Sequence, residues 1–258
     1  MKQISYYILE HFENSNFSIL ERLHINKDIG NHHYNYHPTS RDELKELADQ
    51  LIKKRGNDAD LNDIDTSQIT DMSVLFDESN FNGDISEWDV SNVKDMSYMF
   101  YDSEFNGDLS NWDVSNVETM DSMFDKSKFN GDISNWDVSN VKNMNSMFME
   151  SKFNGDISQW DVSNVKDMSY MFGESKFNGD ISEWDVSNVE SMNGMFEDSK
   201  FNRNISDWDV SNVKDMASMF AYSKFNGDIS KWDVSNVENM YCMFDKSPLE
   251  KNQPKWYY

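Results

Sequence analysis

The 24-residue stretch FNGDISEWDVSNVKDMSYMFYDSE, residues 81–104, decides the fold, because six further copies follow it without an insertion. We number the positions of this unit as columns 1 to 24, which places phenylalanine in column 1 and tryptophan in column 8. These two columns hold Phe81, Phe105, Phe129, Phe153, Phe177, Phe201 and Phe225, and Trp88, Trp112, Trp136, Trp160, Trp184, Trp208 and Trp232. A fixed period of this length is typical of proteins built from stacked units.

The repeat array extends beyond the seven full units at 81–248. A partial leading unit at 57–80 keeps the apolar columns, at Leu61, Ile64, Ile69, Met72, Leu75 and Phe76. A half-unit at 249–258 places Leu249 in column 1 and Trp256 in column 8. We therefore divide the chain into an N-terminal segment, 1–56, and a repeat solenoid, 57–258.

Each unit is expected to contain a short parallel strand and a short helix. Columns 2 to 6 read as an extended segment with Ile85 facing inward. From Ser91, a good helix N-cap, the apolar residues Val93, Met96 and Phe100 follow at i, i+3 and i+7, as on one helix face. Neither element can bury its apolar face alone, so the units must stack. The predicted fold class is an α/β solenoid with leucine-rich-repeat-like coils, nine of which would span about 40 Å at strand spacing.

Seventeen methionines and eight tryptophans could suggest a cofactor or metal site. Nearly all of them occupy repeat columns, however, so we interpret them as internal ladders of the core. The single cysteine, Cys242, excludes an intrachain disulfide and a cysteine metal cluster.

The N-terminal segment contains a predicted capping helix at 41–55. Ser40-Arg41-Asp42-Glu43 is a capping box, an apolar stripe follows, and Gly56 ends the helix after three basic residues. Upstream, a second helix is indicated by Ile4, Tyr7, Ile8 and Phe12. Between them lie His32, His33 and His37, which could bind a transition metal but lack a cysteine or carboxylate at recognisable ligand spacing.

The motif WDVSNV-xx-M-xx-MF, at residues 88–100 and in every later unit, resembles the BspA-like bacterial surface-protein repeats, an atypical branch of leucine-rich repeats. The similarity covers residues 57–258. It implies a curved solenoid with strands on its concave side and, in some members, adhesion or protein binding. It supplies no catalytic residues. Many members are exported or surface-located.

The net charge of the chain limits the classes of molecule that it could bind. With 47 acidic and 23 basic residues, the formal net charge is −24. Such a charge repels nucleic acid and anionic membranes, so we expect no direct nucleic-acid binding and no membrane insertion. The first residues do not resemble a signal peptide, and no apolar run could span a bilayer. The compartment stays unknown, with the cytoplasm favoured over the surface location of the resembled family.

No motif for catalysis appears. The chain has no phosphate loop, nucleophile elbow or His-Glu zinc pattern, and all five histidines precede residue 38. We expect a protein that is not an enzyme and that needs no cofactor.

Two columns of aspartate could form a binding surface. Column 4 holds Asp84, Asp108, Asp132, Asp156, Asp180 and Asp228, and column 9 holds Asp89, Asp113, Asp137, Asp161, Asp185, Asp209 and Asp233. The rows could bind cations or a basic partner, or each aspartate could accept a backbone hydrogen bond at its own turn. For column 9 we favour the turn, and for column 4 both interpretations stay open. Asn204 interrupts column 4, beside Arg203, which replaces the column-3 glycine.

Tyrosines in the variable columns 17, 18, 21 and 22 are the other candidate binding residues, namely Tyr98, Tyr101, Tyr170, Tyr222 and Tyr241. These columns are expected to lie on an outer helix face, where aromatic side chains could anchor a partner.

The leading functional hypothesis is a monomeric, non-enzymatic scaffold that binds a basic protein partner through an acidic concave sheet or the outer helix face. The first alternative is an acidic nucleic-acid mimic that inhibits a DNA- or RNA-binding protein. The second is a calcium-dependent adhesin, although calcium needs several oxygen ligands per ion.

Overall fold

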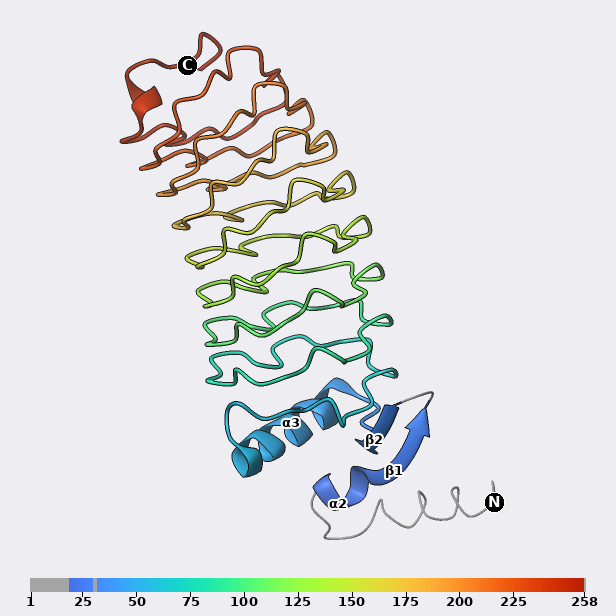
Figure 1. The fold of residues 1–258 in the computed structure, drawn as a ribbon. Coiled ribbons are helices and arrows are strands. Elements are labelled where there is room, and N and C mark those ends of the chain that lie inside the picture. The colour runs from blue at the N-terminus through green and yellow to red at the C-terminus, as the bar shows by residue number, and fades with distance from the viewer. Residues whose placement is uncertain (1–18, 30–31, 258) are drawn as a thin grey trace.

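The computed structural model describes residues 19–29 and 32–257, and Figure 1 shows a long stack of evenly spaced coils with a small N-terminal unit at one end. That unit contains α2 (Ile19–Leu23), β1 (His24–Ile29), β2 (His32–Tyr36) and α3 (Arg41–Arg55). Strands β1 and β2 form an antiparallel pair. The last element, the 3-10 helix η1 (Pro248–Glu250), lies near the C-terminal end of the stack. The helix predicted around Ile4, Tyr7, Ile8 and Phe12 lies outside the described residues.

Helix α3 covers the first coil and has the bounds that the sequence predicts. The Ser40 hydroxyl accepts the backbone N–H of Glu43 at 3.3 Å, and the Gly56 N–H donates to the Ile52 carbonyl at 2.8 Å. The buried face of α3, which consists of Leu44, Leu47, Ala48 and Leu51, belongs to the same apolar core as the coils. Arg41 donates from Nε to the Ser73 carbonyl oxygen at 2.8 Å, so the helix is bonded to the stack as well as packed on it.

The prediction of a short helix in every unit is wrong. In the described residues, the seven full units contain tight turns and isolated bridges in place of helices. Backbone N–H groups in columns 16, 18, 20 and 22 donate to the next coil. In the first full unit these bonds run from Met96 to Thr119 (3.1 Å), Tyr98 to Asp121 (2.8 Å), Phe100 to Met123 (2.9 Å) and Asp102 to Asp125 (2.8 Å). We call this side of the stack, columns 15 to 22, the ladder side.

Two features of the ladder side exclude a helix. Columns 18 and 22 have positive φ throughout, for example 57° at Tyr98 and 43° at Asp102, which is the conformation of the third residue of a type II turn. The turn between Met96 and Met99 is closed by a hydrogen bond of 3.2 Å. Adjacent coils are also bonded directly to each other, at a spacing of about 4.8 Å, whereas a helix occupies about 10 Å. A helix in each coil would force neighbouring coils apart.

The strand expected in columns 2 to 6 is only partly formed. A parallel bridge joins Asp60 to Asp84, and no named strand follows in the later units. The segment is nevertheless extended, and side chains replace some backbone acceptors. The Asn130 N–H donates to Oδ1 of Asn106 at 2.7 Å, and the same bond recurs in column 2 along the stack.

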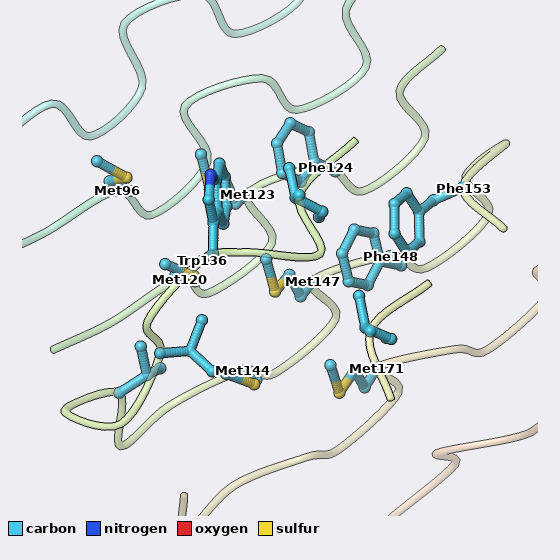
Figure 2. Close-up of a cluster of buried hydrophobic side chains, with 14 of the residues drawn as sticks. Met96, Met120, Met123, Phe124, Trp136, Met144, Met147, Phe148, Phe153 and Met171 are labelled. Carbon is cyan, nitrogen blue, oxygen red and sulfur yellow. The ribbon is translucent and has the colours of Figure 1, made fainter. Parts of the chain in front are cut away.

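The predicted core columns are buried in successive coils, and Figure 2 shows Met and Phe side chains stacked on one another there. Phe148 and Phe153 have ring centroids 4.2 Å apart, and Phe124 and Phe148 lie 5.8 Å apart. Trp160 is only 3% exposed. The methionines and tryptophans of the repeat are thus packing residues, which confirms the interpretation from their columns.

Candidate binding surface

The column-4 row consists of Asp84, Asp108, Asp132, Asp156, Asp180 and Asp228, and each aspartate first serves its own turn. Oδ1 of Asp132 accepts the backbone N–H of Ser134, two residues later, at 3.0 Å. The other members make the same bond at 2.9 to 3.0 Å. Asn204 keeps it at 3.1 Å, since an amide oxygen accepts equally well. The turn interpretation of column 4 is therefore confirmed, and partner binding stays a prediction.

These turn bonds also keep the row ionised. The backbone hydrogen bond from Ser134 lowers the pKa of Asp132 below its ordinary value, and the corresponding serines lower the pKa of the rest of the row. The carboxylates of Asp84 and Asp132 raise the pKa of Asp108 and so oppose the turn bonds, because like charges in neighbouring coils repel. The row is exposed and carries one negative charge per coil except at Asn204.

The column-9 row makes the same kind of turn, as we favoured. Oδ1 of Asp137 accepts the Ser139 N–H at 3.0 Å, and the Ser91 hydroxyl adds a bond of 2.6 Å to Asp89. Hydrogen bonds from the Ser211 side chain and backbone lower the pKa of Asp209. Column 9 is thus a second exposed row of aspartates, located beyond the column-8 tryptophan.

The candidate tyrosines lie on the ladder side and not on a helix, so the structure does not gather them with the column-4 row. Tyr98 is 40% exposed, Tyr222 46% and Tyr241 77%. Lys126 Nζ lies 3.1 Å from the Tyr101 hydroxyl and 5.3 Å from its ring centroid, and Lys246 contacts Tyr222 in the same way. Aromatic and cationic groups therefore share this side of the stack.

The packing of Tyr170 depends on Gly194, a glycine outside the consensus. A Cβ on Gly194 would lie 2.3 Å from the Tyr170 ring, and Gly194 has a φ of 58°. Burial, with Glu197 and Asp215 nearby, raises the pKa of Tyr170. Tyr170 is thus packed along the surface and is less available as an anchor than Tyr98 or Tyr222.

Columns 14 and 24 carry charged residues that the sequence-based prediction did not include, although both columns are visible once the units are aligned. In the full units, column 14 contains only lysine and glutamate, and Glu118 pairs with Lys142 at 2.7 Å while Glu190 pairs with Lys214 at 2.6 Å. Column 24 is basic in five consecutive units, at Lys128, Lys152, Lys176, Lys200 and Lys224, all of which are exposed. An acidic chain with −24 net charge thus carries one uninterrupted basic row.

A buried carboxyl group on the ladder side was also missed. Asp125 is 7% exposed, and its Oδ1 has no hydrogen-bond partner among the described residues. Burial, with Glu150 and Asp102 nearby, raises the pKa of Asp125 to about 7, although the Lys126 ammonium lowers it. Asp125 occupies column 21, where neighbouring units carry tyrosine and methionine, so the repeat pattern gave no signal for it.

The histidine cluster is only partly described. His32 and His33 lie in β2, whereas His37 Nδ1 lies 3.0 Å from Oδ2 of Asp65 in the leading unit. Within residues 19–29 and 32–257, no three His, Cys, Asp or Glu side chains are grouped as metal ligands. None of the helices in this part of the chain combines the length and apolar character that crossing a bilayer would require.

A protein-family model described as "Mycoplasma protein of unknown function, DUF285" matches the chain three times, at residues 44–152, 103–200 and 149–256. Together these matches run from the capping helix to the C-terminal half-unit, so the chain belongs to this family. The threefold match confirms a repeat protein. No curated protein and no solved structure matches the chain.

Proposed function

We propose that the chain is a non-enzymatic protein-binding scaffold that holds a basic protein segment on its column-4 row. The observation that supports this proposal is the turn chemistry of the row. Every aspartate uses Oδ1 for the backbone bond of its own turn, and the carboxylates of Asp108, Asp132 and Asp156 are nevertheless exposed. One ionised oxygen per coil is therefore held in a fixed place for a partner.

The regular spacing of the row favours an extended partner over a compact ligand. Successive carboxylates repeat at about the strand spacing of 4.8 Å. A lysine- or arginine-rich segment lying along the stack could contact several of them at once. Exposed charge pairs are individually weak, so the affinity would come from their number and would fall steeply with added salt.

The stacked coils and the WDVSNV motif favour a solenoid of the BspA-like, leucine-rich-repeat-related group, with turns in place of the expected helices. The absence of enzymatic activity belongs to this proposal. A nucleic-acid mimic is a second candidate, since it would use the same regular acidic row against a basic groove. Competition with DNA for a common partner separates the mimic from the scaffold.

The experiment that tests the scaffold is affinity capture from the native source with two baits. The wild-type chain should retain a basic protein in 0.15 M salt and release it at high salt. The triple variant Asp108→Asn, Asp132→Asn, Asp156→Asn keeps the turns, as Asn204 does, but removes three charges, so it should lose that protein. Equal capture by both baits would contradict the proposal.

A further inference from the structure

The basic column-24 row and the acidic column-4 row lie on one face of the stack. Exposure alternates from column 24 to column 5. The lysines of column 24, the aspartates of column 4 and the asparagines of column 2 are exposed, apart from the half-buried Asn178, whereas the phenylalanines of column 1 and the isoleucines of column 5 are buried. Side chains two residues apart in an extended segment point to the same side. We call this surface the striped face, and define it by the repeated sequence KFNGD at 128–132, 152–156, 176–180 and 224–228.

The central stripe of this face is the asparagine ladder. Each column-2 side chain accepts the backbone N–H of the following coil, as Asn130 Oδ1 does from Asn154 at 2.8 Å. The ladder fixes the coil spacing at this place. Gly131 helps to keep the face flat, because a Cβ there would lie 2.9 Å from the Phe129 ring. The two charged rows therefore run parallel to each other, about 13 Å apart across four extended residues.

Each charged row repels itself in the isolated chain. Lysines or aspartates in neighbouring coils are spaced at about 4.8 Å, and like charges directly opposite each other on adjacent strands are destabilising. Among the described residues of column 24, only Lys128 forms an ion pair, with Glu104 at 3.8 Å. Lys152, Lys176 and Lys224 thus remain open to an external carboxylate.

We propose that the striped face binds the striped face of a second copy of this chain, in a parallel dimer. A two-fold axis along the asparagine ladder exchanges the two edges of the face, so that every lysine row meets the partner's aspartate row. The same 24-residue unit sets the spacing of both rows, so the charges stay in register over the coils that carry KFNGD. Asn80 and Glu104 stand in place of lysine ahead of Asp84 and Asp108. The contact is closed and uses the same patch on both subunits.

The inference rests on the proposed function, since it uses the column-4 row as the binding surface for a row of basic side chains. It also departs from the monomer expected from the sequence. The face is about 13 Å wide and spans a few coils at 4.8 Å each, which places the contact in the small, transient class of interfaces. Arg203 and Asn204 break the pattern in one coil, so that coil contributes least.

The net charge of the chain determines the salt concentration at which the dimer can be detected. Two chains of −24 repel each other at long range, and about 0.15 M salt screens this repulsion beyond roughly 8 Å while contact pairs survive. Sedimentation equilibrium from 10 µM to 1 mM is the test, with these concentrations chosen as orders of magnitude for a weak contact. The weight-average mass of the wild type should rise above 30.3 kDa with concentration and return to it in about 1 M salt.

Three variants make the test specific. Lys152→Glu, Lys176→Glu, Lys224→Glu should stay monomeric at every concentration, whereas the matching lysine-to-arginine triple should associate like wild type. The control Lys94→Glu, Lys142→Glu, Lys166→Glu reverses three charges in column 14 and should also associate. A wild type that stays monomeric, or association that survives the column-24 reversal or is lost in the column-14 control, overturns the inference. Binding of a basic peptide to the column-4 row would be unaffected by that result, so the two proposals fail separately.

Discussion

The indole Nε1 of Trp160 donates a hydrogen bond of 3.1 Å to the carbonyl oxygen of Ile133, 27 residues earlier and one coil below. Every column-8 tryptophan makes this bond, up to Trp256 in the half-unit. The tryptophan therefore does two things at once. It fills the core, and it gives a second hydrogen bond to a carbonyl that already accepts the Trp136 N–H at 3.2 Å, so it ties one coil to the next.

Replacing Trp160 with phenylalanine should lower the free energy of unfolding by about 2 to 4 kcal/mol, because it removes a buried bond and leaves a cavity. Urea denaturation followed by circular dichroism measures the loss. Trp256→Phe is the matched control, because Trp256 is only partly buried at the end of the stack. Both tryptophans make the coil-to-coil bond, so equal losses at the two positions would show that core packing does not add to the loss at Trp160.

The turn role of column 4 predicts a difference between two substitutions of Asp132. Asp132→Ala removes the acceptor of the Ser134 N–H and should cost about 1 kcal/mol. Asp132→Asn keeps the acceptor and relieves repulsion between neighbouring carboxylates, so stability should be unchanged or slightly higher. Thermal unfolding at low salt compares the two variants. A loss for asparagine as large as that for alanine would mean that the charge, and not the turn bond, stabilises this position.

The buried Asp125 should make the free energy of unfolding depend on pH with a sign opposite to that of the column-4 aspartates. Its folded-state pKa of about 7 lies above the unfolded value, so its protonated form stabilises the fold. This contribution is complete below the unfolded pKa and is lost as the pH rises to 7. The groups that act on it are Lys126, Glu150 and Asp102.

Asp125→Asn should therefore become more stable relative to wild type as the pH rises from 5 to 8, by a few kcal/mol at most. Urea unfolding at several pH values gives this difference. Asp245→Asn is the control, because Asp245 occupies the same column but is exposed. A pH-independent difference between Asp125→Asn and wild type would show that Asp125 ionises in the folded chain as it does in the unfolded one.

Gly194→Ala should cost about 1 to 3 kcal/mol, because the new Cβ meets the Tyr170 ring and the residue keeps a left-handed backbone. Tyr170→Ala in the same chain removes the collision, so the double variant should lose less than the two single losses added together. A double-mutant cycle by urea denaturation measures this coupling. Additive losses would indicate that the backbone conformation alone demands glycine.

Several features could be predicted from the sequence because each rests on a local or periodic rule. The coil length follows from the spacing of phenylalanine and tryptophan, the core from the apolar columns, and α3 from its capping box and terminal Gly56. The helix in each unit was wrong for a physical reason. Val93, Met96 and Phe100 have helical spacing, but consecutive tight turns also direct them inward. Positive φ at residues such as Tyr98 and Val74 leaves no mark in the sequence, because these side chains do not favour it.

The candidate surface was predictable only in part. Column 4 was visible as a row of aspartates, and its turn bonds follow from the serine two residues later. The row's relation to column 24 depends on which residues share a face, and this became clear only from the alternating burial of residues such as Phe129 and Asn130. The pKa of Asp125 depends on packing between neighbouring coils, which no single unit encodes.

The central claim is that the column-4 row, as a specific line of charge, is the binding surface for a basic segment. Titration calorimetry with a decalysine peptide in 0.05 M and 0.15 M salt tests it most directly, with wild type and two triple variants. One variant is Asp108→Asn, Asp132→Asn, Asp156→Asn in column 4. The other is Asp113→Asn, Asp137→Asn, Asp161→Asn in column 9, which removes the same charge from the same coils and keeps the same kind of turn.

The account predicts that the column-4 variant binds the peptide at least about tenfold more weakly, equivalent to about 1.4 kcal/mol, while the column-9 variant stays within about twofold of wild type. Equal weakening by both variants would show that the peptide senses only net charge, and unchanged binding by the column-4 variant would place the partner elsewhere. Either result would contradict the claim.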